Sequence, residues 1–142
     1  MRRLFFLIDS YNVIRYIGNR YIVARYTGVT MASLTSYLPL TESTYLILLS
    51  LLSERHGYGI MQYIEEVSGG RIKIGPGTLY GGLKSIMKKK WIEELGTEVK
   101  SRRRCYRLTE EGRALLEAEI ERLEELTAIG KNALSKPVRG DE

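Results

Sequence analysis

The chain has 142 residues, of which 44% are apolar and 27% charged, the proportions of an ordinary globular protein with a buried core. A single cysteine, Cys105, excludes an intramolecular disulfide framework. No apolar run approaches the roughly 20 residues that span a bilayer, so we expect a cytoplasmic protein without a membrane segment.

The net charge is +5, and the basic residues are concentrated in one part of the chain. Residues 71–107 contain eleven Lys or Arg against three Glu, whereas residues 109–126 contain seven Glu against two Arg. A basic block of this kind attracts a polyanion, but charge runs are also common on solvated faces that bind nothing. The placement of these charges on the predicted elements has to decide between the two.

Residues 1–30 differ from the rest, with five Arg, no Lys, no Glu and an Arg-Tyr pair that recurs every five residues. Neither a helical period nor strict alternation fits this stretch. Asp9 interrupts the apolar run 4–8, which argues against a signal peptide. We interpret residues 1–30 as an atypical extension, disordered or arising from a misplaced start, with Met31 as the natural start. The alternative is a basic arm that lies along phosphates.

Two helices are predicted before residue 70. The first runs from Thr41 to Arg55, with Thr41 or Ser43 as its cap, and its run of leucines leaves almost no polar face. A helix that is apolar nearly all round must be covered on more than one side, so we expect a partner chain on one of them. The second helix runs from Tyr58 to about Val67 and ends at Ser68-Gly69-Gly70, before a strand-like stretch 71–74.

A third helix is predicted from Pro76, with Gly75 as its cap, to about Lys90. Its inner stripe consists of Leu79, Leu83 and Ile86, with Met87 at the edge. The opposite face is narrow and cationic, and consists of Gly77, Gly81, Lys84 and Lys88, flanked by Thr78, Tyr80 and Ser85. Glycines weaken a helix, so this face suits a helix that must lie close to another surface.

A β-hairpin and a long helix complete the chain. Strands are expected at 92–95 and 104–108, on either side of a polar loop with basic residues at its tip. Thr109 caps a last helix that runs to residue 134, with a stripe formed by Leu116, Ile120, Leu123, Leu126 and Ile129. Such a helix is too long for a small domain to bury alone, and dimerisation would cover it.

The order helix, helix, turn, helix and basic hairpin predicts a mainly α fold with a small β-hairpin, that is, a winged helix-turn-helix. We divide the chain into the extension 1–30, a DNA-binding domain 31–108, a C-terminal dimerisation helix 109–134 and a tail 135–142. The third helix would enter the major groove of DNA. The expected DNA contacts are Tyr58, Gly77, Thr78, Tyr80, Gly81, Lys84, Lys88, Lys100, Arg102, Arg103 and Arg104. The alternative for the arginines is a solubilising, edge-protecting strand.

Residues 38–131 resemble a short member of the PadR family of transcriptional regulators. The matching stretches are 46–52, His56-Gly57-Tyr58-Gly59-Ile60-Met61, Gly75-Pro76-Gly77-Thr78-Leu79-Tyr80, the stretch from Arg102 to Thr109, and Gly112. Three positions depart from the family pattern: Gly82 where alanine is common, Trp91 where glycine is common, and Cys105 where an aromatic is common.

The resemblance implies a homodimer built by the first and last helices, and a repressor that binds double-stranded DNA at a pseudo-palindromic operator. It leaves room for a small-molecule effector that the sequence does not identify. The expected interface residues are Leu46, Leu49, Leu116, Ile120, Leu123 and Leu126.

An enzymatic function is not expected, because the sequence contains no reactive constellation. His56 is the sole histidine and is interpreted as a helix-turn residue, and Cys105 as a small apolar strand residue rather than a redox sensor. Trp91 and Tyr106 are interpreted as packing residues of the core or hairpin rather than as a ligand cage. The only aspartates, Asp9 and Asp141, lie near the chain ends, and we expect no cofactor and no metal. The rival interpretation is a winged helix that docks onto proteins or binds RNA.

Overall fold

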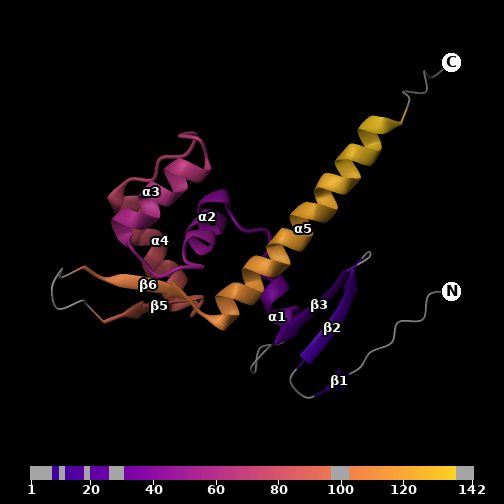
Figure 1. Cartoon of the computed structure of the whole chain (residues 1–142), viewed down its shortest axis with the longest axis horizontal. Coiled ribbons are helices and arrows are strands. Elements are labelled where there is room, and N and C mark those ends of the chain that lie inside the picture. Colours follow the sequence, from indigo (N-terminus) through magenta and orange to yellow (C-terminus); the bar gives the residue numbers. More distant parts are fainter. Residues whose placement is uncertain (1–7, 10–11, 18–19, 26–30, 97–102, 137–142) are drawn as a thin grey trace.

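The structure is a computed structural model of the chain. It describes residues 8–9, 12–17, 20–25, 31–96 and 103–136. A body of short helices and a small sheet carries one long C-terminal helix, which extends away from it (Figure 1). None of the described helices is long and apolar enough to cross a membrane.

The described residues before Met31 form strands, which the sequence did not predict. Strands β1 (Ile8–Asp9), β2 (Asn12–Ile17) and β3 (Arg20–Arg25) make an antiparallel sheet in that order. The five-residue repeat has a structural counterpart, because β2 and β3 pair so that Tyr16 lies opposite Tyr21. The short helix α1 (Met31–Thr35) follows. The proposed basic arm remains a prediction.

Helix α2 (Glu42–Ser50) begins as predicted but ends five residues early. The Thr41 side chain accepts a hydrogen bond from the Thr44 amide, which confirms it as the cap. The expected continuation to Arg55 is wrong, because Arg55 and His56 form strand β4, which pairs with the later strand β6 (Cys105–Leu108). The pairing of β4 with the distant strand β6 therefore replaces the extension of α2 to Arg55.

Helix α3 (Gly57–Val67) is followed by Gly69 and Gly70, which terminate it as predicted. Both glycines have positive φ, +61° and +77°, and their amides bond back to the carbonyls of Glu66 and Glu65. This is a Schellman cap, for which glycine is suited because it has no Cβ. The strand expected at 71–74 is absent from these described residues. Its alternating pattern arises because Ile72 and Ile74 pack against the core from an irregular segment.

Helix α4 (Pro76–Lys88) has Gly75 as its N-cap and Pro76 in its first turn, as predicted. Leu79, Leu83 and Ile86 are buried, and Met87 is partly buried, so the inner stripe is confirmed. After α4 the chain closes a second Schellman cap, in which the amides of Lys90 and Trp91 bond to the carbonyls of Met87 and Ile86. Here the left-handed position is occupied by Lys90, with φ of 62°.

Replacing Lys90 by glycine should therefore stabilise the protein. A side chain in the left-handed region costs about 1 kcal/mol or more, which glycine avoids. We expect Lys90→Gly to raise the free energy of unfolding in urea by about 0.5–1 kcal/mol, after the greater entropy of an unfolded glycine is subtracted. Lys89→Gly, at a position with ordinary helical angles, is the matched control and should destabilise. A Lys90→Gly protein less stable than wild type would contradict this reading of the cap.

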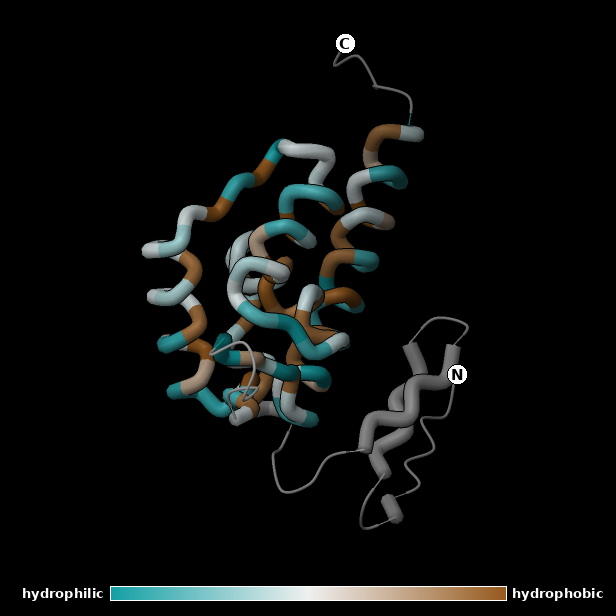
Figure 2. The backbone as a smooth tube through the Cα atoms, turned by 60° about the vertical axis from the view of Figure 1, so that its left-hand side comes forward, coloured by the Kyte–Doolittle hydropathy of each residue, from teal (hydrophilic) through white to brown (hydrophobic). Residues whose placement is uncertain are grey.

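Strand β5 (Ile92–Leu95) pairs with β6, and the second sheet has the order β4-β6-β5. Helix α5 (Glu110–Ser135) follows, and the Thr109 side chain caps it by accepting a hydrogen bond from the Gly112 amide. The first turns of α5 are packed into the core, whereas its later turns are exposed. Figure 2 shows hydrophobic residues at intervals along the whole of this helix, beyond the part that the body covers.

Candidate nucleic-acid interface

The outer face of α4 is exposed along its whole length. Gly77, Thr78, Tyr80, Gly81, Lys84, Ser85 and Lys88 all lie on this surface. A Cβ built at Gly77 or Gly81 would meet no atom within 4 Å, so the packing of the protein itself does not require these glycines. They leave two gaps in the side-chain layer, through which another molecule can approach the helix backbone closely.

The two lysines of this face are available to a ligand. Among the described residues, no carboxylate forms an ion pair with Lys84 or Lys88. By contrast Lys73, in the irregular segment before α4, pairs with Glu65 at 2.9 Å. Among the described residues, the positive charge on the outer face of α4 is therefore not compensated, and the glycines make this face narrow.

The hairpin of β5 and β6, which is the wing of this fold, contributes exposed arginines beside α4. Arg103 and Arg104 are exposed just before β6, and Arg104 lies 3.5 Å from Glu94 of β5. Arg107 is held by Glu93 at 2.6 Å and is therefore not part of the free basic surface. Lys100 and Arg102, also expected to contact DNA, lie outside the described residues.

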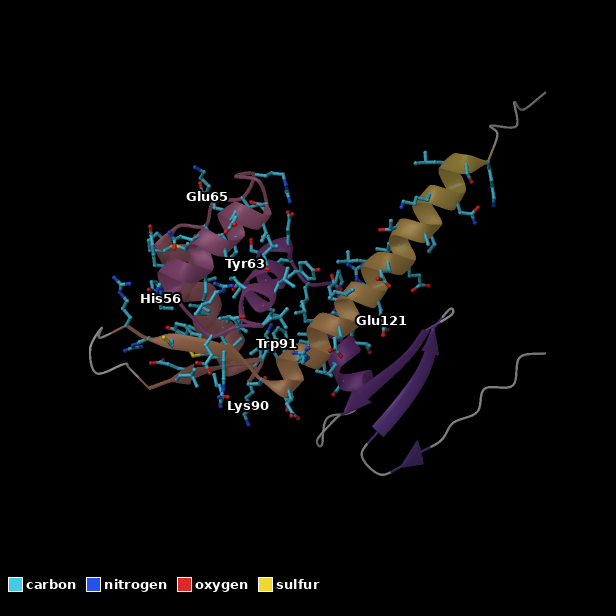
Figure 3. All side chains as sticks on the ribbon, in the orientation of Figure 1. His56, Tyr63, Glu65, Lys90, Trp91 and Glu121 are labelled. Atoms are coloured by element: carbon cyan, nitrogen blue, oxygen red, sulfur yellow. The ribbon has the colours of Figure 1, made fainter. Side chains whose placement is uncertain are left out.

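The start of α3 completes this face. Tyr58 is exposed there, as expected for a contact residue. His56 caps the helix, because its Nδ1 accepts a hydrogen bond from the Gly59 amide at 3.0 Å. Figure 3 shows His56 at the end of α3 that lies beside strand β6. The structural role expected for His56 is thus observed, and Cys105 is a free, partly buried residue of β6.

The expected interface residues fall into three groups by burial. Leu46 and Leu116 are only 9% and 2% exposed and belong to the core of this chain, so they present little surface to a partner. Leu49 and Ile120 are partly buried. Leu123 and Leu126 are 37% and 51% exposed, and the exposed stripe continues to Ile129 and Leu134, which the interface set did not include.

The residues missed from the sequence are those whose neighbours are distant in the chain. Gly57 lies under the hydroxyl of Tyr80, since a Cβ built at Gly57 would come within 2.5 Å of that oxygen. Tyr106 was expected only to pack, and it is buried, but it also lines a pocket with Tyr80. Nothing local in the sequence indicates either contact. Among the described residues there is no cluster of His, Cys, Asp and Glu that could hold a metal.

The sequence profile of the transcriptional regulator PadR-like family matches residues 46–118, which include the second half of α2, all of α3 and α4, the wing and the start of α5. This chain belongs to the PadR-like family. Two solved structures are similar to this PadR-like chain. A transcriptional regulator from Clostridium thermocellum is 26% identical, with a TM-score of 0.54, over 74% of this chain and 99% of the other. A PadR family transcription regulator from Clostridium difficile is 23% identical, with a TM-score of 0.57, over 67% of this chain and 100% of the other, and it supports the fold.

A curated relative is the uncharacterized 37.1 kDa protein in transposon TN4556 of Streptomyces fradiae, 39% identical over 89 residues. That match covers 61% of this PadR-like chain but 25% of the relative, so the chain spans about a quarter of the length of the protein it matches. The expected family and winged-helix fold are thus confirmed. The family and its structural neighbours are transcriptional regulators, not enzymes.

Proposed function

We propose that this PadR-like protein is a sequence-specific regulator of transcription that binds double-stranded DNA as a homodimer. The observation that carries the proposal is the exposed face of α4, where Lys84 and Lys88 form no ion pair with a described residue and lie beside two glycines that the described packing does not require. An α-helix fits the major groove, and its side chains can reach base edges and phosphates there. Arg103 and Arg104 of the wing would hold the adjoining backbone.

Dimerisation is supported by the exposed stripe on α5. Leu123 and Leu126 lie on one side of a helix whose later turns the body does not cover, and their burial against a second copy would remove apolar surface from water. A two-fold dimer would present two copies of α4 to successive major grooves, about 34 Å apart. The operator would then be pseudo-palindromic, and occupation of a promoter would repress by excluding polymerase. A small-molecule effector is compatible with this arrangement.

The first test is an electrophoretic shift of the full chain on its own upstream promoter, with unrelated duplex as competitor. A discrete band that resists the competitor is the expected result. Displacement to the same extent by any duplex, or no shift at all, would overturn operator binding. Preference for single-stranded RNA would favour the RNA-binding alternative, and the absence of any nucleic-acid binding would favour a protein-docking module.

Lys84→Ala should weaken operator binding and make it less sensitive to salt. Each phosphate contact that is lost lowers the slope of log affinity against log salt by about one unit. The matched control is Lys73→Ala, which also removes one lysine, but one already paired with Glu65 and off the α4 face. We expect a clearly shallower slope for Lys84→Ala than for Lys73→Ala in salt titrations. Equal slopes in wild type and Lys84→Ala would exclude this lysine from the DNA surface.

Leu123→Glu should dissociate the dimer, because it places a charge in the apolar stripe of α5. Asn132→Glu is the control, since nine residues at about 100° each place it on the opposite side of the same helix. Light scattering at matched concentrations should show a monomer for Leu123→Glu and a dimer for Asn132→Glu. If Leu123→Glu remained dimeric, α5 would not be the interface.

A further inference from the structure

A pocket of about 590 Å³ lies at the junction of α3, α4 and the wing, beside the outer face of α4, with which it shares Tyr80. It is lined by His56, Gly57, Tyr58, Tyr80, Arg103, Arg104 and Tyr106. None of the described residues that line it is Asp or Glu, whereas hydroxyl, imidazole and guanidinium groups come from all three elements. The lining therefore offers hydrogen-bond donors and positive charge, which suits an anion.

The floor of the pocket contains a buried hydroxyl group without a partner in the described part of the chain. Tyr106 is only 2% exposed, and no described residue hydrogen-bonds to its phenol. Buried polar groups are nearly always hydrogen-bonded, and an exception points to a water or a ligand. Burial, followed by the negative charge of Glu94, raises the pKa of Tyr106 above its ordinary value of 10.0, so the phenol keeps its proton and can donate it in a hydrogen bond.

The walls place further donors around this hydroxyl. The Tyr80 hydroxyl lies against Gly57, which is possible only because residue 57 has no Cβ. The His56 Nδ1 accepts from the Gly59 amide, which leaves the proton of the neutral ring on Nε2 as a second donor. The pocket also lies at the N-terminal end of α3, which is the positive end of the dipole of that helix.

Charge at the rim comes mainly from one arginine. Arg104 is partly compensated by Glu94, 3.5 Å away, whereas Arg103 forms no ion pair with a described residue. Tyr58 and Tyr80, also on the rim, are exposed. A duplex seated against α4 would bring its sugar–phosphate chain across this rim, since the wing and the start of α3 border the recognition helix.

We propose that this pocket holds one phosphodiester group of the DNA backbone, which accepts hydrogen bonds from Tyr106 on the floor and from the donors of the walls. The proposal rests on the duplex binding proposed above and adds a specific contact to it. Because the pocket is built from α3, α4 and β6 together, a phosphate held there would set the register of α4 in the groove. Phosphate contacts position a protein on DNA, while base contacts specify the sequence.

The test combines two changes at the same contact, on the operator identified by the shift assay. Each phosphate of a half-site is replaced in turn by a neutral methylphosphonate, and each duplex is titrated with wild type, Tyr106→Phe and Tyr63→Phe. Tyr63 is a partly buried tyrosine of α3 that stacks under Arg55 and does not line the pocket, so it controls for the loss of a hydroxyl. A hydrogen bond to a charged group is worth about tenfold or more in affinity.

We expect Tyr106→Phe to lose about tenfold on the unmodified operator. At one position of the operator, the methylphosphonate should lower the affinity of wild type and of Tyr63→Phe. The affinity of Tyr106→Phe should be the same with and without that modification. Gly57→Ala, which needs only the tip of Tyr80 to move, should reduce the same sensitivity without removing any donor.

Three results would overturn the proposal while leaving operator binding intact. Tyr106→Phe could bind like wild type at every position, or it could bind more weakly yet keep every methylphosphonate sensitivity, which would indicate a structural hydroxyl only. Finally, inorganic phosphate could bind to wild type but not to Tyr106→Phe while both proteins keep the same methylphosphonate sensitivities, which would assign the pocket to a small free anion. Failure of all duplexes to bind would instead refute the proposed function.

Discussion

Gly112→Ala should destabilise the protein by about 3 kcal/mol or more, the largest effect that we expect from a single methyl group. A Cβ built at Gly112 would lie 2.0 Å from the carbonyl oxygen of Trp91, a backbone atom. The same carbonyl accepts the Thr109 amide, and the Thr109 hydroxyl donates to the carbonyl of Lys90. These bonds tie the start of α5 to the end of α4, so relief of the clash requires the two elements to separate.

Gly130→Ala is the matched control for that variant. Gly130 lies in the same helix, and a Cβ built there would meet no atom within 4 Å. Alanine at an open position in a helix should stabilise by up to about 1 kcal/mol. Urea unfolding can be followed by the fluorescence of Trp91, the only tryptophan, which is buried. Similar free energies of unfolding for the two variants would show that the close contact at Gly112 does not exist.

Glu119→Ala should cost about 2–3 kcal/mol, because it removes a buried carboxylate that pairs with a partly exposed arginine and leaves an amide without its acceptor. Glu119 is only 1% exposed, and both of its oxygens accept hydrogen bonds from Arg122, at 2.7 and 2.8 Å. Its Oε1 also lies 3.3 Å from the Leu40 amide, so it connects α5 to the segment before α2. Glu117→Gln is the control, because Glu117 pairs with Arg113 on the surface of the same helix, where such a pair contributes little.

The pH dependence gives a second readout of Glu119. The hydrogen bond from Arg122 lowers the pKa of Glu119 from its ordinary value of 4.5, against the opposing effect of burial. The folded state therefore binds this proton less readily than the unfolded state. Its stabilising contribution is fully present above pH 4.5 and is lost as the pH falls through the lowered pKa. Glu119→Gln should remove this part of the acid sensitivity, and an unchanged acid profile in urea unfolding would argue against the ion pair.

The sequence by itself determined the elements whose signals are local. Thr41, Pro76, Thr109 and the Gly69-Gly70 pair act on the backbone within about one helical turn, so their caps and ends could be predicted. The inner and outer faces of α4 follow from helical periodicity alone, which is why Leu79 and Leu83 were placed in the core and Lys84 on the exposed face.

The tertiary structure decided what depends on contacts between distant residues. Helix α2 ends at Ser50 because Arg55 and His56 pair with β6, fifty residues further on. Leu46 and Leu116, expected at the dimer interface, are used in the core because α2 and α5 pack together within one chain.

The candidate pocket shows the same division. Gly57 and Tyr80 carry no local sign of their contact. The place of Tyr106 in the pocket, where its hydroxyl has no partner among the described residues, arises only when β6 lies beside α3 and α4. Local capping and periodicity act over a few residues, whereas burial and pairing act across the fold. The sequence could therefore place α4 and its exposed face, and only the folded chain could show what surrounds them.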